Sequence, residues 1–211
     1  LGFQLGNGDI EVLPHPLNDK HGRTAQLAQW NLLHEGARTT PMLLVLSPSD
    51  HPYKFLLQRY HDLCALVGPL PPPRVVSLDH GYQRFLLIRL PERRASGECV
   101  TPAMAWIDTP VPGARVEDGF SVEGWAFKDG VGLDAVEVLV DGKAVARADY
   151  GADYDVTAFW KISNDPQHPN VGFDARIDTR ALAPGRHWLG MSLHGKDGSV
   201  EEWAEQPFVV E

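Results

Sequence analysis

Ala135-Val136-Glu137-Val138-Leu139-Val140-Asp141-Gly142-Lys143-Ala144-Val145-Ala146 is the most informative stretch of the sequence. Val136, Val138 and Val140 recur at every second position, which is the period of a strand with one buried face. Asp141-Gly142 follows directly, and a second short run begins after it. Two such runs joined by Asp-Gly predict a β-hairpin, because both residues of the tight turn must adopt positive φ.

The rest of the second half continues in short runs of this kind. Strands are predicted over residues 120–127, 156–160, 171–177, 187–193 and 200–210. Turn signals such as Pro184-Gly185 separate them. About seven short strands in about 100 residues indicate an immunoglobulin-like β-sandwich.

The first half mixes strand and helix signals. Strands are predicted over residues 10–13, 42–46, 75–78 and 84–90, and helices over residues 24–35 and 50–67. This alternation predicts a small α/β layer with a partly parallel sheet. Residues 91–112, which are rich in proline, are predicted to be a linker. The predicted fold class is therefore α+β with two domains, a small α/β domain over residues 1–100 and an all-β immunoglobulin-like sandwich over residues 106–211.

The charge is divided unevenly along the 211 residues. Residues 1–104 carry 10 Lys or Arg and 9 Asp or Glu, whereas residues 105–211 carry 9 and 19, for a net charge of −9 overall. The acidic second half disfavours nucleic acid and anionic lipid as partners, because both carry phosphates. We therefore expect no nucleic-acid partner.

Local patterns in both halves resemble known families. Val122-Glu123-Gly124-Trp125-Ala126 and Gly172-Phe173 resemble bacterial immunoglobulin-like modules. The run 41–45, the helix that begins at Asp50 and the strand 82–87 resemble the soluble tail of polytopic, mannosyltransferase-like bacterial membrane glycosyltransferases. In that family the catalytic acidic residues lie in loops between membrane helices, so the resemblance implies no catalytic residue here.

The resemblance implies a non-catalytic accessory region on the periplasmic or extracytoplasmic face of a bacterial inner membrane. Its role would be to position a glycan, a lipid-linked saccharide or a protein acceptor. The upstream transmembrane region of the same chain would be a further partner. The alternative is a glycan- or protein-binding module of a bacterial cell-surface or secreted protein. A soluble hydrolase is a third hypothesis, although no nucleophile motif or phosphate loop supports it.

Tryptophans provide the candidate ligand contacts. Sugar-binding sandwiches present flat rings beside carboxylates, because the C–H face of a pyranose packs on an aromatic ring. Trp160 is the leading candidate because it precedes a polar loop, and Trp188 is the second. Asp153 and Asp155 are the accompanying carboxylates. The alternative, that these rings fill the core of the sandwich, stays open.

Metal-binding motifs are absent from the sequence, and we expect no metal and no cofactor. The nine histidines form no His-Glu-x-x-His motif, and the two cysteines form no Cys-x-x-Cys motif. A calcium site among the aspartates near Asp153 is a weaker alternative. Cys64 and Cys99 are the candidate disulfide, which would close a loop of about 35 residues. A free, buried Cys64 is the alternative.

Overall fold

The computed structural model describes residue 29 and residues 42–46, 53–71, 74–78, 83–90, 96–156 and 163–211. Three predicted elements lie wholly or mostly outside these residues: the strand over residues 10–13, the helix over 24–35 apart from Gln29, and the strand over 156–160 apart from its first residue. Trp160 also lies outside the described residues. None of the helical segments described is long and apolar enough to cross a membrane.

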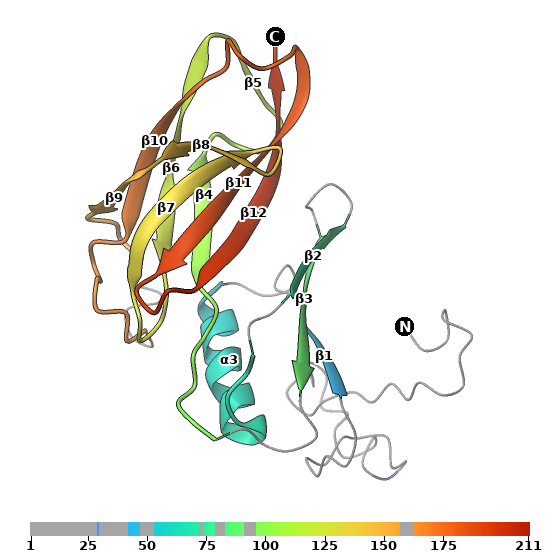
Figure 1. Ribbon diagram of the computed structural model, residues 1–211, viewed down its shortest axis with the longest axis vertical. Coiled ribbons are helices and arrows are strands. Elements are labelled where there is room, and N and C mark those ends of the chain that lie inside the picture. The colour runs from blue at the N-terminus through green and yellow to red at the C-terminus, as the bar shows by residue number, and fades with distance from the viewer. Residues whose placement is uncertain are drawn as a thin grey trace.

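Two facing sheets form the upper part of the molecule in Figure 1. The first has the order β4-β6-β10-β9 and is antiparallel throughout. The second has the order β5-β12-β11-β7-β8, in which β5 pairs with β12 in parallel and the other pairs are antiparallel. The strands of the first sheet are β4 (Met104–Thr109), β6 (Gly119–Phe127), β9 (Asp149–Ala152) and β10 (Gly172–Asp178). Those of the second are β5 (Ala114–Val116), β7 (Leu133–Val140), β8 (Lys143–Arg147), β11 (Gly185–Gly195) and β12 (Val200–Val210).

The core lies between these two sheets, as the alternation of apolar residues predicts. Val136, Val138 and Val140 of β7 are buried, and so are Val122 of β6 and Phe173 of β10. These residues alternate along their strands and point into the core. The immunoglobulin-like β-sandwich predicted for the second half is confirmed.

The predicted Asp-Gly turn joins β7 to β8. Asp141 has φ 50° and Gly142 has φ 75°, so both turn residues are in the left-handed region. This matches the twist of the two flanking strands, and Asp and Gly adopt such angles at low cost. The carboxylate of Asp141 adds two contacts to the neighbouring strand, one with the backbone N–H of Trp188 and one with His187 Nδ1.

The predicted linker, in contrast, contains the first strand of the sandwich. Residues 104–109 form β4, which pairs with β6 from Met104 opposite Phe127 to Thr109 opposite Glu123. The pairing is interrupted between Ile107 and Thr109 by a bulge at Asp108. Prolines on either side of the strand concealed it in the sequence, although none lies within it.

The predicted α+β class with a separate α/β domain is wrong. The elements described are strands with a single helix, α3 (Tyr53–Val67), among them. In the small sheet of the first half, β1 (Met42–Leu46) and β2 (Arg74–Leu78) both pair antiparallel with β3 (Gln83–Leu90), which lies between them. Strand–helix–strand order suggested parallel neighbours, but the insertion of β3 between β1 and β2 leaves no parallel pair in this sheet.

Helix α3 lies beside the small sheet and below the end of the sandwich (Figure 1). Its buried side chains Leu57, Tyr60 and Leu63 belong to one core with Leu86 and Ile88 of β3, and that core continues into the sandwich. The structure therefore has one continuous buried cluster across both parts.

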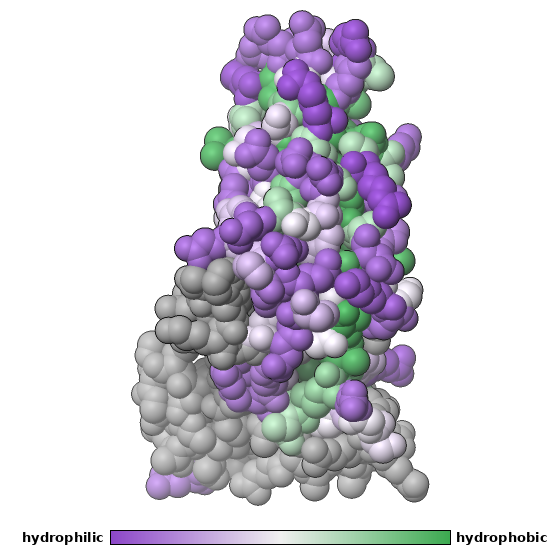
Figure 2. Space-filling model, turned by 90° about the vertical axis from the view of Figure 1, so that its left-hand side faces the viewer, coloured by the Kyte–Doolittle hydropathy of each residue, from purple (hydrophilic) through white to green (hydrophobic). Residues whose placement is uncertain are grey.

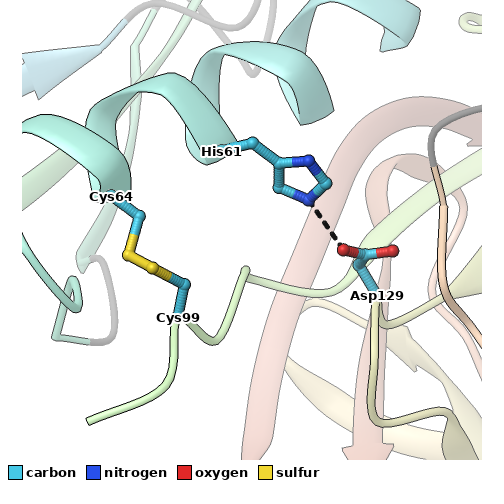
Figure 3. Close-up of a disulfide and its surroundings, with 4 residues drawn as sticks. All are labelled: His61, Cys64, Cys99 and Asp129. Atoms are coloured by element: carbon cyan, nitrogen blue, oxygen red, sulfur yellow. Dashed lines mark hydrogen bonds and ion pairs between the residues drawn. A yellow bond between two sulfur atoms is a disulfide. The ribbon is translucent and has the colours of Figure 1, made fainter.

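Two links attach α3 to the sandwich side of the molecule, as Figure 3 shows. Cys64 of α3 and Cys99, which precedes β4, form a disulfide with their Cα atoms 6.0 Å apart. One turn earlier, His61 Nε2 lies 2.7 Å from a carboxylate oxygen of Asp129 in the loop between β6 and β7. The other oxygen of Asp129 accepts a hydrogen bond from the backbone N–H of Asn164.

The residue before Asp129 is a buried lysine whose charge is neutralised at the base of the sandwich. The Lys128 side chain is 3% exposed, and its ammonium nitrogen lies 2.7 Å from Glu201 Oε1 and 3.4 Å from Asp197 Oδ2. Ser199 Oγ accepts a third contact from it. The backbone N–H of Lys128 donates to the buried carboxylate of Asp165. These contacts fix the loop to which His61 binds.

Candidate functional site

The outer face of the four-stranded sheet carries a partly exposed tryptophan that is the best candidate for a ligand contact. In β4 the side chains of Ala105 and Ile107 are buried, so Trp106 between them points outward, and it is 44% exposed. Its strand is held firmly, because the indole N–H of the buried Trp203 donates to the carbonyl of Ala105. Trp106 therefore presents a flat apolar surface from a rigid strand.

Next to Trp106, the same face continues as a covered aromatic row. Trp106 pairs with Trp125 of β6, which is buried. The ring of Trp125 stacks on that of Phe127 with centroids 5.7 Å apart, and Phe127 lies 5.0 Å from the ring of His168. The pKa of His168 is lowered, chiefly because burial disfavours its charged form. The aromatic row thus has one exposed end, at Trp106.

Tyr154 crosses the sheet above this row. A side chain at Gly172 of β10 would come within 3.3 Å of Tyr154 Cβ, so the tyrosine begins over β10. Its hydroxyl donates a hydrogen bond to Asp108 in the bulge of β4, on the far side of β6. Burial, followed by the hydrogen bond to Asp108 and the charge of that carboxylate, raises the pKa of Tyr154 to about 12. The phenol is therefore a neutral donor at physiological pH.

Carboxylates border the aromatic row. Glu123 of β6 lies opposite Asp174 of β10, and Asp174 lies opposite Asp149 of β9, so all three share one row on the outer face. Each of these side chains is exposed. With Asp108, they place carboxylate acceptors beside the exposed indole, which is a suitable arrangement for hydrogen-bonding the hydroxyl groups of a bound sugar.

Close backbone contact explains the glycine at position 124, next to Trp125 in β6. A Cβ at Gly124 of β6 would lie 2.0 Å from the carbonyl oxygen of Trp106. Any larger residue would push β4 away from β6 and would move the indole with it. Gly124 is therefore required for the position of Trp106.

The residues predicted from the sequence are divided between two faces. Asp153 and Asp155 are exposed and flank Tyr154, so their segment belongs to the four-stranded face. Trp188 is half-buried on β11 opposite Pro207 of β12, on the other sheet. The structure thus separates Trp188 from the two aspartates. Trp160 lies outside the described residues, so its role remains a prediction.

Trp106 and Tyr154 are the candidate residues that sequence reasoning missed. Trp106 was overlooked because it lay in the predicted linker. The run Met104-Ala105-Trp106-Ile107 has the alternation of a strand, and that signal could have identified it. The contact between Tyr154 and Asp108 joins positions 46 residues apart, and no local pattern indicates it.

No group of three or more histidine, cysteine or acidic side chains could hold a metal ion among the residues that the structure describes. Two histidines of the sandwich contact carboxylates or backbone instead. His187 contacts Asp141 and the carbonyl of Ala183, and His194 lies 3.1 Å from Glu137.

Comparison with known proteins gives distant structural likenesses and no family. No protein-family model and no curated protein matches the sequence. Solved structures that match in part include fibronectin(III)-like modules of CbhA from Clostridium thermocellum, with 24% identity over 51% of this chain and 46% of that chain and a TM-score of 0.34. The endo-beta-1,4-mannanase from Thermotoga petrophila shares 13% identity over 55% of this chain and 21% of that chain, with a TM-score of 0.38. CopC from Methylosinus trichosporium OB3b shares 17% identity over 53% of this chain and 91% of that chain, with a TM-score of 0.28.

These likenesses carry no argument about function. The matched region covers less than half the length of the first of these chains and about a fifth of the second. The assignment of a β-sandwich therefore rests on the two sheets and on the core between them.

Proposed function

We propose that the chain is a non-catalytic binding region that holds a glycan on the outer face of the sheet β4-β6-β10-β9, with Trp106 as the platform. The observation that carries this proposal is the 44% exposed indole at the end of a covered aromatic row. Aromatic rings bind apolar faces well while their neighbours supply polar contacts, and a sugar offers both kinds of surface.

The surroundings of Trp106 support the same proposal. Tyr154 and Asp108 hold each other in place beside it, so these groups need little ordering when a ligand binds. Glu123 and Asp174 add acceptors in the next row of the sheet. We expect Asp153 and Asp155 to contribute at the edge of this face. Trp160 remains a predicted contact, whereas Trp188 lies on the other sheet and is not part of the proposed site.

Titration with glycans tests the proposal. The oxidised chain is titrated by calorimetry with soluble β-glucan, mannan and peptidoglycan fragments, and then Trp106→Ala and Trp188→Ala are titrated with whichever glycan binds. We expect Trp106→Ala to lower the affinity about tenfold or more, which corresponds to about 1.4 kcal/mol, and Trp188→Ala to leave it unchanged. Equal affinities for the wild type and Trp106→Ala would overturn the proposed site.

The proposed setting is the periplasmic or extracytoplasmic side of a bacterial inner membrane. The disulfide between Cys64 and Cys99 supports an oxidising compartment, because disulfides persist there and are rare in the cytosol. A membrane glycosyltransferase as the parent protein is the finer proposal, and it rests on the sequence resemblance alone. Membrane fractionation of the native protein tests it, since a product that is released by carbonate as a soluble protein of about 23 kDa would contradict it.

A further inference from the structure

The small sheet β1-β3-β2 has a second apolar face that no described element covers. Opposite residues in a sheet point to the same side, so the pairing of the strands defines this face. The pairs on it include Leu43 with Arg89, Val45 with Leu87, and Val76 with Phe85. Leu43 is 59% exposed and Leu78 is 50% exposed. The other apolar side chains are partly exposed: Val45, Val76, Phe85 and Leu87. We call these residues, together with Arg74 and Arg89, the outer face of the small sheet.

The opposite face of this sheet is already buried. Leu86, Ile88 and Leu90 of β3 belong to the core that also contains the buried side of α3. β3 is therefore apolar on both faces, which is the pattern of a strand that is covered on both sides. A contiguous exposed patch of this kind marks an interaction surface.

The charges on this face indicate the kind of partner. Arg74 and Arg89 are exposed at its border. No carboxylate lies on the face as the register defines it, and neither arginine forms an ion pair with a described residue. A second copy packed face to face would bring four guanidinium groups together without a counter-charge. The face is therefore better suited to an anionic partner with an apolar interior.

We propose that the outer face of the small sheet docks on an anionic lipid surface. Leu43 and Leu78 would enter the interface between headgroups and acyl chains, and Arg74 and Arg89 would contact lipid phosphates. The acidity that disfavours lipid binding is concentrated in residues 105–211, with 19 acidic and 9 basic residues. Figure 1 shows the small sheet in the lower part of the molecule and the C-terminus of the sandwich at the top.

Co-sedimentation with vesicles tests this proposal on the complete oxidised chain. Vesicles of phosphatidylcholine alone are compared with vesicles that contain 30% phosphatidylglycerol. We expect binding to the anionic vesicles only, and we expect it to fall as the salt concentration rises. The double variant Leu43→Ser with Leu78→Ser should abolish binding to the anionic vesicles. Val111→Ser with Val145→Ser is the matched control, because these valines are 65% and 46% exposed on the sandwich, and this control should bind like the wild type.

A second variant covers the case in which the leucine substitutions disturb folding. Arg74→Glu with Arg89→Glu changes only exposed side chains and should reduce binding to anionic vesicles at least about tenfold. Equal binding by this variant and the wild type would overturn the proposal. So would a dimer in light scattering that the leucine substitutions convert to a monomer, because a second copy would then be the partner.

Discussion

Tyr154 and Asp108 are hydrogen-bonded across the width of β6, from the segment after β9 to the bulge in β4. This contact fixes the position of the polar groups next to Trp106. Asp108 is the extra residue where the pairing of β4 with β6 is interrupted, and Tyr154 reaches its carboxylate there.

Titration of Tyr154 measures that contact directly. Burial, together with Asp108, raises the pKa of its phenol to about 12. In a spectrophotometric titration of tyrosinate, Asp108→Asn should lower the pKa of one tyrosine towards the ordinary value of about 10. Tyr154→Phe should remove the same high-pH transition and should cost about 1 kcal/mol of unfolding free energy. An identical titration curve for the wild type and Asp108→Asn would show that the two side chains do not interact in solution.

Lys128 is expected to be the most sensitive charged residue in the base of the sandwich. Lys128→Met leaves Glu201 and Asp197 without their buried counter-charge, so we expect a loss of about 3–5 kcal/mol in denaturant unfolding. The double variant Lys128→Met with Glu201→Gln should recover part of this loss, because the carboxylate at position 201 is then absent. A loss below about 1 kcal/mol for Lys128→Met would contradict the burial of this ion pair.

The disulfide should stabilise the chain by restricting its unfolded state. Cys64 and Cys99 are 35 residues apart, and closing a loop of this length contributes about 3–4 kcal/mol in the chain-entropy model. The double variant Cys64→Ser with Cys99→Ser should therefore unfold at a lower temperature than the wild type. Reduction should lower the unfolding temperature of the wild type and leave that of the double variant unchanged. Thiol counting in denaturant is the control, and two free thiols in the untreated protein would rule out the bond.

The pair formed by His187 and Asp141 should make stability depend on pH. The hydrogen bond with the Ala183 carbonyl, followed by that with Asp141, raises the pKa of His187. Burial acts to raise the pKa of Asp141, but the hydrogen bonds from His187 and the Trp188 backbone outweigh it, and the pKa is lowered. The histidine therefore adds stability that is complete below about pH 6.5 and is lost as pH rises through its folded pKa. The aspartate adds stability that is complete above about pH 3.9 and is lost as pH falls through its folded pKa.

Thermal unfolding between pH 5 and pH 9 checks this expectation. The melting temperature of the wild type should fall more between pH 6 and pH 9 than that of His187→Gln, and the variant should be about 1 kcal/mol less stable at pH 6. Parallel pH profiles for the two proteins would contradict the assignment.

Local signals predicted the elements whose form depends on neighbouring residues. The β7–β8 hairpin follows from Asp141-Gly142, because few other residue pairs adopt two positive φ angles. The strand predicted over residues 200–210 coincides with β12. The alternation of apolar residues was sufficient to predict these strands, since each has one buried face.

Longer-range relationships could not be predicted in this way. The parallel arrangement expected for the first half failed because the insertion of β3 between β1 and β2 depends on tertiary pairing, which sequence order does not reveal. β4 was missed because the prolines around it resemble those of a linker. The candidate site was missed for both reasons, since Trp106 belongs to β4 and Tyr154 reaches Asp108 only after the sheet has formed.

The affinity of Trp106→Ala for a glycan, compared with that of Trp188→Ala, tests the central claim most directly. The two tryptophans lie on different sheets of the same sandwich, so each variant serves as the control for the other. Binding on the outer face of the four-stranded sheet predicts an affinity about tenfold or more lower for Trp106→Ala and unchanged for Trp188→Ala. The reverse order, or equal affinities for both variants and the wild type, would contradict a glycan site at Trp106.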